Sequence, residues 1–135
     1  MALEWTPAMS VGVREIDDQH KQLFASAKRL LDAMLQGKGR YEIHSIVQFL
    51  EKYVVEHFAT EEKLMDQYRY PSSLSHKTQH KLFTSDLVRN KTKLEDGGAD
   101  SATAIQIMQE ISDWLVNHIG KTDKALGDFL SQKMH

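Results

Sequence analysis

The chain has 135 residues, 41% hydrophobic and 27% charged, which suits one soluble domain and leaves no room for two. A formal net charge of -2 with acidic and basic residues mixed excludes the basic surface that binds nucleic acid, and no apolar run is long enough for membrane insertion. Because there are no cysteines and no secretory signal, we expect a cytoplasmic protein without disulfides, thiolate zinc sites or iron–sulfur clusters.

Apolar residues at helical spacing run through most of the chain after an irregular N-terminal arm, which we expect over residues 1–16. Glycines, or a proline at Pro71, separate the helical stretches from one another. We expect helices at about 18–36, 41–68, 73–94 and 101–119, the last followed by a helical segment to about 131. Short connections favour antiparallel neighbours, so the sequence predicts an all-α, up-down-up-down four-helix bundle that forms a single domain over residues 1–135.

Histidine is unusually frequent, with seven residues, and five of them lie on or beside the apolar faces of the expected helices. These five are His20, His57, His76, His80 and His118. His57 is four residues before Glu61, and His76 is four residues before His80. Because residues four apart share one face of a helix, each pair is placed to ligate a common metal ion.

The expected topology brings all five histidines to one end of the bundle, where the first and third helices begin and the other two end. His44 lies at the start of the second helix, about 20 Å along the axis, so we exclude it as a ligand. The terminal His135 is expected to be solvated. A single buried histidine is more often a hydrogen-bonded core residue than a ligand. Five imidazoles converging with a carboxylate would each need a buried partner, so together they predict a metal centre.

Several motifs run through the chain from the arm to the last helix. They are Trp5 with Val11-Gly12-Val13, Ile16-Asp17-Asp18-Gln19-His20, Glu56-His57-Phe58 through Glu61-Glu62, Tyr70-Pro71, His76-x-x-x-His80-x-x-Phe83, and Trp114-Leu115-x-x-His118-Ile119-x-x-x-Asp123. With these motifs the sequence resembles the hemerythrin family, in its single-domain bacterial form, over essentially its whole length. Gly120 and Leu126 replace a proline and an aromatic residue that are common in relatives, a difference that concerns local packing and not the ligands.

The resemblance implies a cofactor of two non-haem iron ions. It makes His76, His80 and His118 ligands of one iron and His20 and His57 ligands of the other, with Glu61, Asp123 and an oxo or hydroxo group as bridges. If both irons are six-coordinate, this set leaves one position open, on the iron with only two histidines. The family then implies that dioxygen binds there reversibly as hydroperoxide, for storage, delivery or sensing, and that the protein is not an enzyme.

Apolar side chains near the expected ligands are candidates for the walls of the oxygen pocket. They are Leu23, Phe58, Trp114, Leu115 and Ile119, whose counterparts line the oxygen site in the relatives that this chain resembles. Each lies next to an expected histidine ligand or about one helical turn away. Their default role is in the core, and shielding the open iron from water and protons would be an additional one.

Other functions are left open by the residues alone. Di-iron oxidases and peroxidases on related bundles use carboxylate-rich ligand sets with Glu-x-x-His pairs, whereas this chain offers five imidazoles and two carboxylates. A nitric oxide or oxygen scavenger would use the same site chemistry as a carrier. A zinc hydrolase is less favoured, because no His-Glu-x-x-His motif occurs, and a purely structural bundle is less favoured still. The sequence does not decide whether an oxygen-consuming enzyme or a signalling domain is the partner.

The spacing of the last ligand pair makes a structural prediction. His118 and Asp123 are five residues apart, and in a regular α-helix their side chains would diverge by about 140°. Both face the metals only if residues 119–122 contain a break or a π-like or 3₁₀-like turn, which Gly120 would accommodate more readily than a bulky residue.

Overall fold

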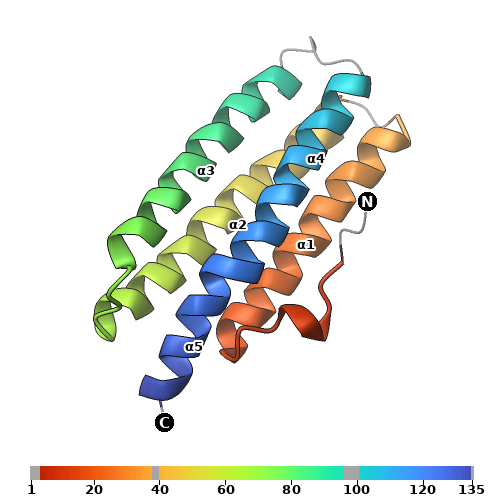
Figure 1. The fold of residues 1–135 in the computed structure, drawn as a ribbon. Helices are drawn as coiled ribbons and strands as arrows, with labels where there is room; N and C mark the ends of the chain where they lie inside the picture. Colours follow the sequence, from red (N-terminus) through yellow and green to blue (C-terminus); the bar gives the residue numbers. More distant parts are fainter. Residues whose placement is uncertain (1–3, 38–39, 96–100, 135) are drawn as a thin grey trace.

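The computed structural model describes residues 4–37, 40–95 and 101–134. Their elements are the 3₁₀ turn η1 (Pro7–Met9), α1 (Arg14–Leu35), α2 (Arg40–Gln67), α3 (Ser73–Glu95), α4 (Ser101–Asn117), the π-helical segment η2 (His118–Asp123) and α5 (Lys124–Lys133). The long helices form a bundle in which α1 and α3 each pack against both α2 and α4 (Figure 1). The predicted all-α four-helix bundle is confirmed. Within the described ranges, no helix is both long enough and apolar enough to span a membrane.

The N-terminal arm differs from the prediction. We expected it to be irregular through residue 16, but it contains η1 and α1 already begins at Arg14. The side chain of Asp17 gives the reason, because its carboxylate accepts a hydrogen bond from the Val11 amide at 2.9 Å and another from the Ser10 hydroxyl. The Asp17 amide in turn donates to the Val13 carbonyl. Asp17 therefore joins the arm to the first turn of α1. Residues 38–39 and 96–100, which belong to the expected connections between helices, and the terminal His135 lie outside the described residues.

The tight turn between α2 and α3 places the end of one helix beside the start of the next. Arg69 adopts a left-handed conformation with φ of 55°, and the Tyr70 amide donates a hydrogen bond back to the Met65 carbonyl at 2.9 Å. The Ser73 amide then donates to the Tyr70 carbonyl, and α3 begins. A connection this short keeps the ligand pair late in α2 close to the pair early in α3.

The apolar core consists of two clusters with a polar layer between them. The larger cluster fills the bundle, and the smaller one joins the arm, α5 and the end of α2. On α2, for example, Phe58 belongs to the larger cluster and Met65 to the smaller, and the buried Glu61 lies between them along the helix. On the last helices, Ile119 and Leu126 flank the buried Asp123 in the same way. The candidate ligands thus occupy a layer closed by apolar side chains on both sides.

Gly127 allows the arm to pack directly against α5. A Cβ atom at this position would lie 1.9 Å from the Val11 carbonyl oxygen, a backbone atom that cannot rotate away. We expect Gly127→Ala to lower the free energy of unfolding by about 1–3 kcal/mol, as overpacking does in well-packed cores. Urea denaturation measures this change. Gly120→Ala is the matched control, because a Cβ there meets nothing within 4 Å, and an equal loss in both variants would contradict the packing argument.

Candidate metal centre

Seven buried side chains form two overlapping clusters of possible metal ligands. One cluster contains Glu61, His76, His80, His118 and Asp123, and the other contains His20, His57, Glu61 and Asp123. Within each cluster the potential ligand atoms lie within 4.8 Å of one another. The carboxylates of Glu61 and Asp123 belong to both clusters, so the chain brings together three imidazoles on one side of the shared pair and two on the other. All seven residues proposed from the sequence meet in this one layer.

The distances between these atoms suit metal coordination. The Nε2 atoms of His76 and His118 each lie 3.0 Å from Asp123 Oδ1, and His20 Nε2 lies 2.9 Å from Oδ2 of the same carboxylate. His80 Nε2 lies 3.1 Å from Glu61 Oε1. Nitrogen and oxygen ligands about 2.1 Å from a shared ion, at right angles to each other, are roughly 3.0 Å apart. The observed contacts therefore have the spacing expected of neighbouring ligands.

Hydrogen bonding gives a second test of the fit. Of the buried side-chain nitrogen and oxygen atoms without a hydrogen-bond partner in the described residues, all but the Trp5 indole nitrogen belong to candidate ligands. They include both oxygens of Glu61 and of Asp123. Buried polar atoms that lack partners are costly, and proteins rarely retain them without a function. Such a concentration of imidazole and carboxylate atoms fits a metal centre.

The π-helical segment η2 carries the two ligands of the last helical stretch. It runs from His118 to Asp123 and lies directly between α4 and α5. The π-helix is wider than an α-helix and pairs residues five apart, so His118 Nε2 and Asp123 Oδ1 approach to 3.0 Å. The predicted departure from α-helical geometry is confirmed. Gly120 is not essential to it, because its φ is not positive and an added Cβ would meet no neighbouring atom.

Burial and crowding shift the pKa values of these groups strongly in the metal-free chain. Burial and the neighbouring imidazoles lower the pKa of His57 to about 3 and that of His80 to about 2. Burial and the nearby Asp123 carboxylate raise the pKa of Glu61 well above its usual range. Burial would also raise the pKa of Asp123, but the surrounding imidazoles hold it well below its usual range. The pKa of His76 rises to about 9, because adjacent carboxylates outweigh the effect of burial.

These shifts predict that the metal-free protein is sensitive to acid. His57 and His80 have folded-state pKa values of about 3 and about 2, below the unfolded value of 6.5, so the unfolded chain takes up more protons there. The stability of the metal-free fold should fall as the pH drops from 6.5 toward 3. The raised pKa of His76 contributes stability that persists over this window and is lost only as the pH rises through about 9. The raised pKa of Glu61 acts in the opposite direction, adding stability as the pH falls toward its unfolded value of 4.5, but it is one group against two. Urea midpoints of the metal-free protein at pH 5.5 and pH 4 measure the effect, and equal midpoints would contradict it.

Three candidate ligands use their second ring nitrogen to donate a hydrogen bond. His57 Nδ1 lies 2.6 Å from Gln19 Oε1, His118 Nδ1 lies 3.0 Å from Gln79 Oε1, and His80 Nδ1 lies 3.0 Å from Glu62 Oε2. Donation through Nδ1 leaves Nε2 free to bind a metal, which is the usual arrangement for histidine ligands. None of these three partners was predicted from the sequence. Their only signal was adjacency, since each follows or precedes a candidate ligand in the chain.

The glutamine partners are themselves held in place by threonine hydroxyls. The Gln19 amide donates to Thr60 Oγ1 at 3.1 Å, and Thr60 donates to the backbone carbonyl of Glu56. On the other side, the Thr122 hydroxyl donates to Gln79 Oε1 at 3.0 Å. These bonds fix the amide orientation, so the glutamine oxygens face the imidazoles as acceptors. The metal layer is thus oriented by a second set of residues on α1, α2, α3 and η2.

The apolar residues proposed for the oxygen pocket all lie in or against the larger core cluster. Leu23, Leu115 and Ile119 are almost fully buried. The ring of Phe58 stacks on His80 with centroids 3.8 Å apart, and the Trp114 ring stacks on His118 at 4.2 Å. Both aromatic rings therefore contact the three-histidine cluster most closely. The Phe58 ring is 5.9 Å from that of His57.

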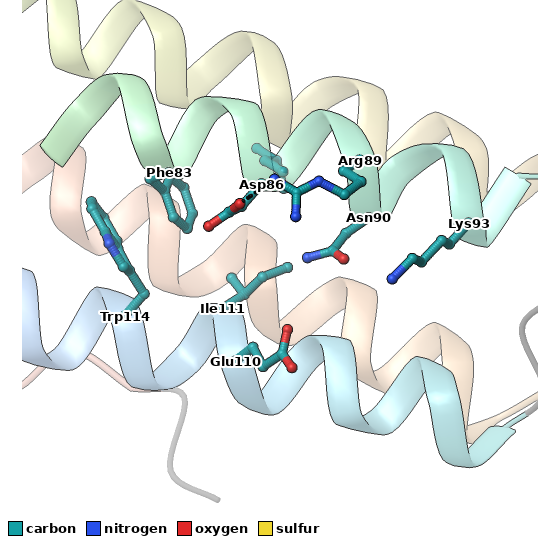
Figure 2. Close-up of a pocket in the computed structure, with 9 residues that line it drawn as sticks. Phe83, Asp86, Arg89, Asn90, Lys93, Glu110, Ile111 and Trp114 are labelled. Carbon is teal, nitrogen blue, oxygen red and sulfur yellow. Dashed lines mark hydrogen bonds and ion pairs between the residues drawn. The ribbon is translucent and has the colours of Figure 1, made fainter. Parts of the chain in front are cut away.

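A cleft of about 320 Å³ runs between α3 and α4 beside this aromatic group. Figure 2 shows Phe83 and Trp114 side by side at one end, with Asp86, Arg89, Asn90 and Lys93 of α3 facing Glu110 of α4 along its length. The Trp114 ring stacks on Phe83 as well as on His118. The cleft is therefore separated from the candidate metal ligands by packed rings.

His44, which the sequence pattern excluded as a ligand, lies near the start of α2 and belongs to neither ligand cluster.

Comparisons with known proteins agree with this geometry. A family model described as the hemerythrin HHE cation binding domain matches residues 11–130. The chain is 32% identical over 132 residues to a bacteriohemerythrin of Pseudomonas aeruginosa, covering 98% of this chain and 84% of that protein. It is 35% identical over 130 residues to a bacteriohemerythrin of Methylococcus capsulatus, covering 96% and 97% respectively. A crystal structure of wild-type hemerythrin matches with a TM-score of 0.84 and 35% identity, covering 97% of this chain and 98% of the other. The chain therefore belongs to the hemerythrin family.

Proposed function

We propose that this protein binds dioxygen reversibly at a di-iron centre and is not primarily an enzyme. In this proposal His76, His80 and His118 hold one iron, His20 and His57 hold the other, and Glu61 and Asp123 bridge them. The observation that carries it is that the two buried clusters share both carboxylates but differ by one imidazole. Where two six-coordinate ions have the same bridges, the ion with fewer imidazoles keeps a position for a small ligand.

The composition of the ligand set favours binding over oxidation of a substrate. Two ferrous ions held here would supply one electron each for the reversible two-electron reduction of dioxygen. Imidazole ligands are neutral, so the five histidines add no negative charge to the centre, which has only the two carboxylates Glu61 and Asp123. Related bundles that oxidise substrates rely instead on sets richer in carboxylates. The apolar layers on both sides of the site limit access of water.

The experiment that tests this proposal is a cycle of oxygen binding and release. The metal-free protein is loaded anaerobically with ferrous iron, and its iron content per chain is measured. Dioxygen is then added and removed under vacuum while the gas taken up and the visible absorption are followed. Reversible binding should return the dioxygen and restore the starting spectrum over repeated cycles. Release of peroxide or water in place of dioxygen would show an oxidase and overturn the proposal.

Leu115 and Ile119 provide a prediction about how the oxygenated protein is protected. Both are almost fully buried on the last helical stretch, beside His118. We expect Leu115→Ala and Ile119→Thr to admit water and to speed oxidation to the diferric protein several-fold, with both irons retained. The decay of the oxygenated absorption in air measures the rate. Ile107→Thr, equally buried but about three helical turns away, is the control. Parental decay rates in both pocket variants would show that these residues are ordinary core.

A further inference from the structure

The five candidate histidine ligands differ in the hydrogen-bond acceptor of their second ring nitrogen, Nδ1. His57 and His118 donate to the neutral amide oxygens of Gln19 and Gln79. His80 donates to the carboxylate of Glu62, at 3.0 Å. The Nδ1 atoms of the remaining two, His20 and His76, are buried and have no hydrogen-bond partner among the described residues. One ligand of the three-histidine cluster therefore has an anionic partner, and neither ligand of the two-histidine cluster does.

We infer that Glu62 is a positioning residue that biases the three-histidine iron toward its ferric state through His80. This inference rests on the proposed role of His80 as an iron ligand. A carboxylate that accepts the Nδ1 proton draws it away from the ring and makes Nε2 a stronger donor to the metal. A stronger donor stabilises the more highly charged ion, which is a recognised way for a protein to set the reduction potential of bound iron. The two irons of the centre would then differ in potential as well as in ligand number.

The surroundings of His80 separate this electronic effect from simple support of the ring. Phe58 stacks on the His80 ring at 3.8 Å with an interplanar angle of only 5°, so the ring plane is already fixed by packing. The side chain of Glu62 is about one-third exposed and reaches His80 from the edge of a groove between α2 and α3. Removing the charge of Glu62 while keeping an acceptor oxygen should therefore leave the orientation of His80 unchanged.

Glu62→Gln is the primary test, because the amide keeps the size and the acceptor oxygen of Glu62 and removes its charge. The variant should bind two irons, and the reduction potential of its centre should rise. A tenfold change in the preference for ferric over ferrous ion corresponds to about 59 mV for one electron. Glu56→Gln is the matched control, since Glu56 is an exposed acid on the same helix and, among the described residues, its carboxylate belongs to neither ligand cluster. An unchanged potential in Glu62→Gln, or an equal shift in the control, would overturn the inference.

A double variant tests whether the position of the negative charge, and not the loss of Glu62 itself, changes the reduction potential. The double variant Glu62→Gln with Gln79→Glu moves the carboxylate from His80 to His118, another histidine of the same cluster. If the charge acts through the ligand nitrogen, the double variant should return toward the parental potential. Failure of the swap to move the potential back, with iron content intact and His118 still donating to the new carboxylate, would contradict the inference.

A measurement without iron distinguishes this inference from the proposed function. The affinity of the metal-free protein for Zn²⁺, measured by competition with a chelating dye, should fall about 10–100-fold in Glu62→Ala, as it does when partners of ligands are removed. Glu62→Gln should fall less, and Glu56→Gln should not change. Unchanged zinc affinity in Glu62→Ala would overturn the role of Glu62. If the parent fails to release dioxygen while the zinc and potential shifts occur, the proposed function fails and the inference about Glu62 stands.

Discussion

Replacement of Glu61 with alanine is expected to abolish binding of both metal ions. Glu61 is the only residue of α2 that belongs to both ligand clusters, and its two oxygens lie 3.1 Å from His80 Nε2 and 3.9 Å from His20 Nε2. Loss of the shared carboxylate removes a ligand from each ion and also one of the two buried anions that balance the positive charge of the metals. Iron analysis of the purified variant by atomic spectroscopy should therefore find almost none, against two ions per chain in the parent.

Two further variants test whether the metal loss in Glu61→Ala comes from removal of a ligand. His118→Ala removes a ligand from the three-histidine cluster alone, so it should disrupt that site more than the other. His44→Ala should keep its full metal content, because His44 belongs to neither cluster. Circular dichroism establishes that each variant remains helical. Equal metal loss in His44→Ala and Glu61→Ala, or a single zinc ion in the parent, would refute the ligand assignment.

Most of the candidate ligands could be predicted from the chain because their spacing follows the period of the α-helix and because neighbouring helices run in opposite directions. The spacing of His57 and Glu61 places both on one face of α2, and the bundle topology brings that face to the end where α3 begins. The five-residue spacing of His118 and Asp123 conflicts with the same period, and this conflict predicted a break or a π-like or 3₁₀-like turn, of which the structure has the π-helical form. A local violation of helix geometry was informative because the global pattern around it was so regular.

Other features depend on contacts that periodicity does not contain. Gln19 and Gln79 are chemically unremarkable in the sequence, and their roles depend on which side chains the neighbouring helix presents at hydrogen-bond distance. The early start of α1 depends on Asp17 reaching back to the arm. Trp114 lies one turn before His118, which predicts that they are close, but only the packing of α3 against α4 decides that its ring covers His118. The sequence shows which residues share one face of a helix, but only the tertiary structure shows which side chains of a neighbouring helix contact that face.

Removal of the metals should cost the protein most of its stability. Without them, the polar atoms of Glu61, Asp123 and four histidines lie buried in the described structure with ion-pair contacts to one another but no hydrogen bond of good geometry. Each such atom costs about 1–3 kcal/mol, and the whole free energy of unfolding of a typical domain is only about 5–15 kcal/mol. The raised pKa of Glu61 points the same way, because burial and the neighbouring Asp123 carboxylate disfavour its ionised form in the metal-free fold.

We therefore expect chelation to lower the melting temperature by roughly 20 °C, the change that corresponds to a loss of several kcal/mol in a domain of this size. Thermal denaturation followed by circular dichroism, before chelation, after it and after metal is restored, measures the change and its reversibility. Glu61→Ala provides the control, because a variant that binds no metal should melt at the same temperature with and without the chelator. If the parent loses its metal completely and still melts at its original temperature, the unpaired atoms must find partners in the metal-free state. The buried layer would then stabilise the fold by itself, and the metals would serve function alone.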